Sequence, residues 1–231
     1  MLNPMRLVIF DCDGTLIDSQ HAIFGSISLA FDTIGLPAPS RAEVLGVVGL
    51  SLPQALAVLA PAESEAVRNQ LIDAYKNGFV GVRARPDHGE ALYEGIAATV
   101  AALAQRGDTL LGIATGKSKR GVARLLAQEA WEGHFATIQT ADDHPSKPDP
   151  SMILKAMAET GAAPHQTVMI GDTTYDMEMA LNAGVGAIGV SWGYHTDDRL
   201  TGAGAHAIVR QGTLLLDAID QRLAAQHEAS S

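Results

Sequence analysis

The chain of 231 residues is 47% hydrophobic and 18% charged, a composition that supports a packed core and excludes global disorder. Its formal net charge of −10 argues against nucleic acid and anionic membranes as partners, because both are polyanions. The one cysteine, Cys12, excludes an intrachain disulfide, no apolar run reaches the ~20 residues of a membrane span, and no signal peptide is visible, so we expect a cytoplasmic protein.

The first predicted element is a strand over residues 6–10, a continuous apolar run that ends at Asp11. Residues 19–84, which follow it, contain helical patterns and no convincing strand. These patterns cover residues 22–34, 52–59 and 63–82. The first strand therefore leads into a mostly helical insert, and we expect this insert to lie above the carboxyl end of that strand.

After the insert, apolar runs alternate with helical patterns to the end of the chain. The runs predict strands over residues 109–114, 135–139, 167–170, 185–190 and 205–209. The helical patterns cover residues 119–129, 150–160, 174–183 and 214–225. This alternation predicts an α/β fold with a doubly wound, Rossmann-like parallel sheet. We expect residues 1–18 and 85–231 to form this core, and residues 19–84 to form a second, helical cap domain.

Polar residues follow the first predicted strand, and ligands of open α/β sheets bind outside such strand ends. Asp11 and Asp13 are two residues apart, so their side chains point the same way if the strand stays extended. Two carboxylates held close together repel each other unless a cation or a proton joins them. Gly14 allows a tight turn whose backbone N–H groups face an anion. The alternative is a polar turn that caps a helix at Thr15 or Ser19.

A hydroxyl side chain ends the second strand of the core. Thr115 is followed by Gly116, and the Thr115 hydroxyl and nearby N–H groups would hold an oxyanion. Ser118 fits equally well as the N-cap of the next helix. The Gly-Lys-Ser sequence that starts at Gly116 suggests a nucleotide-binding P-loop, but Leu111 occupies the position where that motif needs its first glycine. We therefore exclude a P-loop.

Two further segments place charged residues near the same edge of the sheet. Lys147 lies on a loop made rigid by two prolines, and Asp172 follows the strand predicted over residues 167–170. Asp176 comes four residues after Asp172, one helical turn away, and would face the same site. Alone, Lys147 fits a solvated lysine, and the acidic pair fits an ordinary helix start. Together with the first carboxylate pair, these oxygen ligands suit a hard cation such as Mg²⁺.

Taken in order, the segments DCDGT, ATGKS, SKPDP and GDTTYD resemble the four motifs of the haloacid dehalogenase superfamily. The helical insert after the first motif resembles the cap domain of that superfamily, and the wider pattern resembles its phosphoglycolate phosphatase-like branch. Residues 92–96 fall where that branch returns to the core. The resemblance implies an Mg²⁺-dependent phosphatase that acts on a small phosphorylated metabolite, as a monomer or a homodimer.

The resemblance also implies roles for three carboxylates. Asp11 would attack phosphorus and form an aspartyl phosphate that water then hydrolyses. Asp13 would protonate the leaving oxygen and later activate the water. Mg²⁺ would bind Asp11, Asp172 and the backbone carbonyl of Asp13.

The same resemblance implies an oxyanion-binding set around the transferred phosphoryl group. Gly14, Thr115, Gly116 and Lys147 would hold its oxygens, and Lys147 would also offset the charge of the nucleophile. Asp176 would support the lysine or a metal-bound water.

Three other activities stay open from the sequence. A β-phosphoglucomutase-like phosphotransferase or isomerase uses the same acid/base residue, so Asp13 does not exclude it. A metal-independent haloacid dehalogenase usually carries another residue at the position of Asp13. A non-catalytic binding protein would keep the fold without needing the full set of charged residues. Whichever holds, the loop over residues 48–52 of the insert is the best candidate to touch the leaving group.

Overall fold

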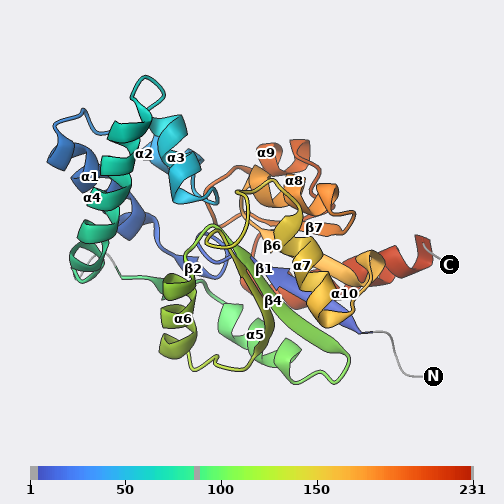
Figure 1. Ribbon diagram of the computed structural model, residues 1–231. Helices are drawn as coiled ribbons and strands as arrows, with labels where there is room; N and C mark the ends of the chain where they lie inside the picture. Colours follow the sequence, from blue (N-terminus) through green and yellow to red (C-terminus); the bar gives the residue numbers. More distant parts are fainter. Residues whose placement is uncertain (1–4, 86–88, 230–231) are drawn as a thin grey trace.

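A parallel sheet forms the centre of the protein, which we describe from a computed structural model over residues 5–85 and 89–229 (Figure 1). Within these residues six strands pair in the order β5 (Phe135–Thr140), β4 (Thr109–Thr115), β1 (Arg6–Phe10), β6 (Thr167–Gly171), β7 (Gly186–Val190) and β8 (Ala207–Val209). All neighbouring strands of this sheet run parallel. The predicted α/β class with a Rossmann-like parallel sheet is confirmed.

Helices cover both faces of the sheet. One face packs against α5 (Ile96–Ala104), α6 (Lys119–Gln128) and α10 (Leu215–Ala229). The other packs against α7 (Ser151–Thr160), α8 (Thr174–Asn182) and α9 (Asp197–Gly202). Successive strand residues point to opposite faces, so Val8 and Phe10 enter the first core and Leu7 and Ile9 the second. This two-sided burial explains why the strands read as continuous apolar runs.

The predicted core strands and helices all form, with ends that differ from the prediction by a few residues. The sequence patterns did not reveal α5, α9 or two short 3₁₀ turns, η1 (Pro164–Gln166) and η2 (Gly212–Leu214). Helix α5 was not predicted because its sequence, IAATVAALA, is apolar or small on every side and shows no helical periodicity. In the part of the chain that the structure describes, no helix combines the length and the apolar character needed to cross a membrane.

The helical insert consists of α1 (Gln20–Ile34), α2 (Arg41–Gly46), α3 (Leu52–Leu59) and α4 (Glu65–Arg83). These helices gather beside the sheet (Figure 1) and share a small hydrophobic core of their own. The sequence missed α2, a six-residue helix that a Ser40–Glu43 capping box begins. The division into a core of residues 1–18 and 85–231 and a cap of residues 19–84 stays a proposal, and residues 1–4, 86–88 and 230–231 lie outside the described part.

The chain enters and leaves the insert at neighbouring points. β2 (Ile17–Asp18) pairs antiparallel with β3 (Ala91–Leu92), and the N–H of Tyr93 donates to the carbonyl of Leu16 at 3.1 Å. Strands of two residues are too short to show a pattern in the sequence. The pairing of β2 with β3 holds both ends of the insert beside the carboxyl end of β1.

The strand order also determines where a ligand can bind. From β1 the chain builds β4 and β5 on one side, and then crosses to build β6, β7 and β8 on the other. Ligands of such sheets bind at this switch point, outside the carboxyl ends of the strands. The ends of β1, β4 and β6 are therefore the expected floor of a site.

Candidate active site

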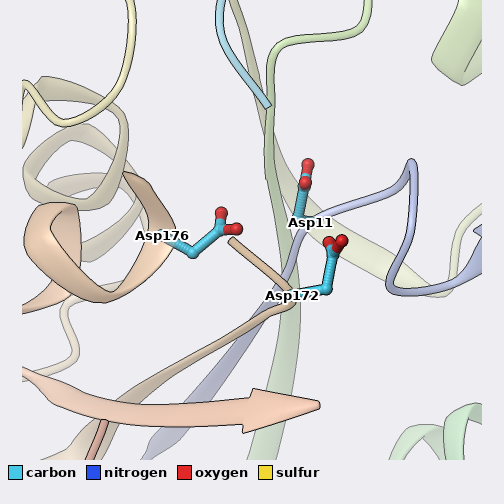
Figure 2. Close-up of side chains that lie close together, drawn as sticks. All are labelled: Asp11, Asp172 and Asp176. Carbon is cyan, nitrogen blue, oxygen red and sulfur yellow. The ribbon is translucent and has the colours of Figure 1, made fainter. Parts of the chain in front are cut away.

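Three carboxylates converge at the switch point (Figure 2). Asp11 directly follows β1, Asp172 directly follows β6, and Asp176 lies in the first turn of α8. One oxygen from each of them lies within 4.8 Å of the others, and all three residues are buried. The predicted convergence of Asp11 and Asp172 at one edge of the sheet is therefore seen in the geometry.

Both carboxylate oxygens of Asp11 are buried and accept no hydrogen bond within the described residues. The ammonium of Lys147 lies 3.0 Å from one of them. Burial raises the pKa of Asp11 to about 6, with Lys147 opposing this rise and Asp176 adding to it. A buried carboxylate whose oxygens accept no hydrogen bond and meet only the Lys147 ammonium is a favourable site for a cation.

Asp172 is held by two hydrogen bonds from distant parts of the chain. The hydroxyl of Thr15 donates to one oxygen and the backbone N–H of Tyr194 donates to the other, each at 2.9 Å. Burial, followed by the charges of Asp176 and Asp11, raises the pKa of Asp172 well above its usual value. Gly14 has a φ of +87°, and a Cβ added to it would collide with the Asp172 carboxylate. The turn after β1 thus needs a glycine to pass so close to Asp172.

Lys147 lies between two of the carboxylates. Its Nζ is 2.6 Å from Asp176 and 3.0 Å from Asp11, and its side chain is fully buried. Burial alone would lower the pKa of Lys147, but the charges of Asp11 and Asp176 outweigh that effect and raise it. The second oxygen of Asp176 accepts from the N–H and the hydroxyl of Thr173 at 3.1 and 2.6 Å. Asp176 therefore has its own partners and positions the lysine.

The Asp13 side chain is not part of this three-carboxylate group. β1 ends at Phe10, and the chain then turns so that Asp13 bridges to Ile17. The condition for a shared direction of Asp11 and Asp13, an extended strand, is therefore not met. Instead, Asp13 contacts the Lys117 ammonium at 2.7 Å, although Asp11 and Asp13 both line one cavity.

Lys117 and Glu90 are site residues that the sequence reasoning missed. The Lys117 ammonium joins Asp13 to Glu90, which lies 2.9 Å away, and Arg124 contacts Glu90 at 3.0 Å. The sequence could have indicated Lys117, because it lies two residues after the end of β4. It was considered only as part of a possible P-loop, which we excluded. The sequence could not indicate Glu90, because this residue belongs to no motif, does not follow a strand of the core sheet, and has partners that are distant in sequence.

The end of β4 is covered by the insert. The Thr115 hydroxyl accepts from the N–H of Lys117 at 3.2 Å, and the Ser118 side chain caps α6 by accepting from Gly121 at 3.2 Å. A Cβ on Gly116 would lie 2.6 Å from the carbonyl oxygen of Leu50. The loop over residues 48–52 therefore rests directly on this strand end. The predicted alternative role of Ser118 as the N-cap of α6 is seen in the structure.

A cavity of about 530 Å³ lies between the insert and the strand ends. Its floor includes Asp11, Asp13 and Thr115, and its opposite wall includes the loop over residues 48–52. The buried charges near the floor fit a divalent cation, since three carboxylates face one ammonium and both oxygens of Asp11 accept no hydrogen bond within the described residues. Among the described residues, no histidine or cysteine joins this group, so the donors are oxygen atoms of the kind that hard cations prefer.

Comparison with known proteins agrees with this geometry. Residues 8–190 match the haloacid dehalogenase-like hydrolase family. The chain belongs to this family. The match spans the floor from β1 to β7, together with the helical insert of this haloacid dehalogenase-like hydrolase.

Individual relatives of this hydrolase have phosphatase names. It is 37% identical to the probable phosphatase IndB of Dickeya dadantii (strain 3937), over 88% of each chain. It is 26% identical to a phosphoglycolate phosphatase of Vibrio vulnificus (strain YJ016), over 93% of this chain and 96% of that protein. A crystal structure of a predicted phosphatase from Clostridium acetobutylicum superposes with a TM-score of 0.83 at 26% identity, covering 94% of this chain and 99% of that one.

Proposed function

We propose that this phosphatase of the haloacid dehalogenase-like hydrolase family hydrolyses a small-molecule phosphate monoester through an aspartyl phosphate on Asp11. The observation that carries the proposal is the state of Asp11. Its carboxylate is buried at the floor of a cavity, keeps both oxygens free of hydrogen bonds and has the Lys147 ammonium beside it. A side chain of this kind is poised to attack an electrophile rather than to stabilise the fold.

The first half of the proposed reaction transfers the phosphoryl group to the enzyme. A carboxylate oxygen of Asp11 forms a bond to phosphorus, and the bond from phosphorus to the leaving oxygen breaks. Asp13 donates its proton to that oxygen. To do so, its carboxyl group must break its 2.7 Å contact with Lys117 or keep that contact through only one oxygen. In the second half, Asp13 takes a proton from water, which displaces Asp11 from phosphorus.

Charge on the transferred group is balanced by residues at the three strand ends. Lys147 offsets the negative charge on Asp11 and on the phosphoryl oxygens, and Asp176 keeps it in place at 2.6 Å. The Thr115 hydroxyl and the backbone N–H of Gly116 hold the remaining oxygens. These donors sit in a buried site, where each contact is stronger than in water. The N–H of Gly14 donates to the carbonyl of Ile17 at 2.9 Å, so it does not take the oxyanion-binding role that the sequence suggested for it.

We propose Mg²⁺ as the cofactor, held by Asp11, Asp172 and the backbone carbonyl of Asp13. When bound, Mg²⁺ supplies positive charge that offsets the repulsion between a carboxylate and a phosphate. The hydrogen bonds from Thr15 and Tyr194 fix Asp172 for this role. The partner is a small phosphorylated metabolite, and the setting is the cytoplasm, with the protein a monomer or a homodimer.

Hydrolysis of p-nitrophenyl phosphate by the purified protein tests the proposal. We expect turnover with Mg²⁺, its loss with EDTA, and free phosphate as the product. Asp11→Asn should lower kcat by ~10³-fold or more, because it removes the nucleophile. Asp73→Asn, an exposed change on α4, is the matched control and should leave kcat unchanged. Full activity of Asp11→Asn in a folded protein would refute the assigned nucleophile.

A further inference from the structure

The two sides of the active-site cavity differ in chemistry. The floor presents the carboxylates, Thr115 and Lys117, while the side formed by the insert presents mainly hydrocarbon. That apolar wall comes from the four helices α1 to α4 and the loop over residues 48–52, and it includes Ile23, Ile27, Val44, Leu52, Ile72 and Phe79. A molecule in this cavity would place its phosphate on the floor and its remaining part against the wall.

The apolar wall is part of a packed core, so it exists before any ligand binds. Ile27 and Val44 are buried members of the hydrophobic core of the insert, and Ile23, Leu52 and Ile72 pack against them. Tyr75 adds an aromatic ring that packs on Phe79 with 5.5 Å between ring centroids, together with one hydroxyl. A preformed apolar surface binds hydrocarbon without the entropic cost of ordering it.

Two of the four basic side chains that line the cavity form ion pairs with nearby carboxylates. Lys117 contacts Asp13 and Glu90, and Arg124 contacts Glu90 while its guanidinium lies 5.8 Å above the Phe79 ring. Lys76 and Arg120 also line the cavity, but both are exposed to solvent. In the described part of the chain, the apolar wall therefore presents few buried polar groups to a polyhydroxylated leaving group, and an anionic one would meet the solvent-exposed Lys76 and Arg120.

The volume of the cavity also favours a substrate with a sizeable apolar part. A cavity of about 530 Å³ lies within the range of sites that hold drug-sized ligands, and a two-carbon hydroxyacid would leave most of it unfilled. Unfilled apolar volume gives no binding energy, whereas each buried methylene strengthens binding by about fourfold.

We propose that the substrate is a phosphate monoester of an apolar alcohol or phenol, whose hydrocarbon part lies against the wall formed by α1, α2, α3 and α4. This inference rests on the proposed function and names the substrate class for the same site. Contact with the wall lies away from the reacting bond, so it acts on substrate and transition state alike and appears in KM more than in kcat.

Calorimetric titration with n-alkylphosphonates in the presence of Mg²⁺ tests the inference without needing turnover. From ethylphosphonate to hexylphosphonate, we expect Kd to fall by about fourfold per methylene until the cavity is filled, with an increasingly negative heat-capacity change. A Kd that is independent of chain length, or that rises with it, would overturn the inference.

Substitutions in the insert test whether the apolar wall causes the dependence of Kd on chain length. Ile72→Thr should weaken hexylphosphonate binding by about fivefold to tenfold and leave ethylphosphonate binding unchanged, which also shows that the variant is folded. Asp73→Asn, next to it on the exposed side of α4, should change neither. Equal loss for both ligands, or no loss for hexylphosphonate, would contradict the assigned wall.

Measurements of ester hydrolysis distinguish a failure of this inference from a failure of the proposed function. Propyl phosphate and glycerol 1-phosphate have the same carbon count, and we expect the higher kcat/KM for propyl phosphate. Chain-length-dependent binding without hydrolysis of any ester would support the apolar site and contradict the proposed function. Rapid hydrolysis of polar esters with no dependence on chain length would support the proposed function and contradict the apolar site.

Discussion

At the scale of single residues, the site depends on charges that are buried together. Lys147 is fully buried, with its ammonium 2.6 Å from Asp176 and 3.0 Å from Asp11. Pairs of this kind add little net stability compared with apolar packing, but removing one partner leaves an uncompensated buried charge. The lysine is therefore required by its neighbours as well as by the reaction that we propose for it.

We predict that Lys147→Met abolishes turnover and lowers the free energy of unfolding by about 3 kcal/mol, because two buried carboxylates lose their counter-charge. Urea unfolding of both proteins without Mg²⁺ measures the difference. Lys155→Met removes an exposed lysine that pairs with Glu159 at 3.5 Å, and it should cost less than ~0.5 kcal/mol. Equal stability of Lys147→Met and the native protein would show that Lys147 does not balance these charges.

A second residue-scale prediction concerns Glu90. Burial alone would raise the pKa of Glu90, but the charges and hydrogen bonds of Lys117 and Arg124 outweigh it, and the pKa lies below its usual value. A carboxylate with a lowered folded-state pKa stabilises the fold above its unfolded pKa of about 4.3, and this stabilisation is lost as pH falls through the folded pKa.

Glu90→Gln should therefore be less stable than the native protein by about 2 kcal/mol at neutral pH, and the gap should close below about pH 4. Urea unfolding across this pH range measures it. Glu132→Gln, an exposed carboxylate, provides the control and should track the native protein at every pH. A gap that stays constant with pH would mean that Glu90 acts through packing and not through its charge.

At the scale of elements, the insert meets the floor of the cavity through the end of α2 and the loop over residues 48–52. The loop over residues 48–52 touches Gly116, the N–H of Ser51 donates to the Ser146 hydroxyl at 2.8 Å, and the Tyr175 hydroxyl donates to the carbonyl of Gly46 at 3.0 Å. These contacts close the cavity from above. Closure of this kind excludes water from a reacting phosphate and restricts which leaving groups fit.

Gly116→Ala should disturb this closure. The new Cβ would lie 2.6 Å from the Leu50 carbonyl oxygen and 2.7 Å from that of Gly49, so the loop must move away from the floor. We expect kcat/KM for p-nitrophenyl phosphate to fall by ~10-fold or more, since small misplacements in an active site are costly. In Gly107→Ala the Cβ meets open space, and its kcat/KM should match that of the native protein.

At the scale of the whole molecule, the strand order explains why residues so distant in sequence form one site. β1 is central, and its neighbours β4 and β6 lie on either side of the switch point. Asp11, Thr115 and Asp172 each stand at the end of one of these strands. The sequence could predict this convergence, because apolar runs ending in polar residues indicate strand ends, and strand ends of a parallel sheet meet at one edge.

What the sequence could not predict follows from contacts without a periodic or local signal. Tyr194 holds Asp172 through a backbone N–H, which every residue type except proline would provide. Glu90 reaches Lys117 only because β2 and β3 bring the return of the insert beside the turn after β1. The Asp13 side chain turns toward Lys117 because the strand ends at Phe10, and strand ends are set by hydrogen bonds to neighbours that the sequence does not name.

The most direct test of the central claim is to trap the phosphoryl group on Asp11. In Asp13→Asn, hydrolysis of the intermediate should be slow, while p-nitrophenyl phosphate still reacts because its leaving group needs no proton. Mass spectrometry of this protein, quenched in acid during reaction with Mg²⁺, should find one phosphoryl group on the peptide that contains Asp11, and none when Asp11→Asn is added. A phosphoryl group on another residue, or turnover by Asp11→Asn, would contradict the account.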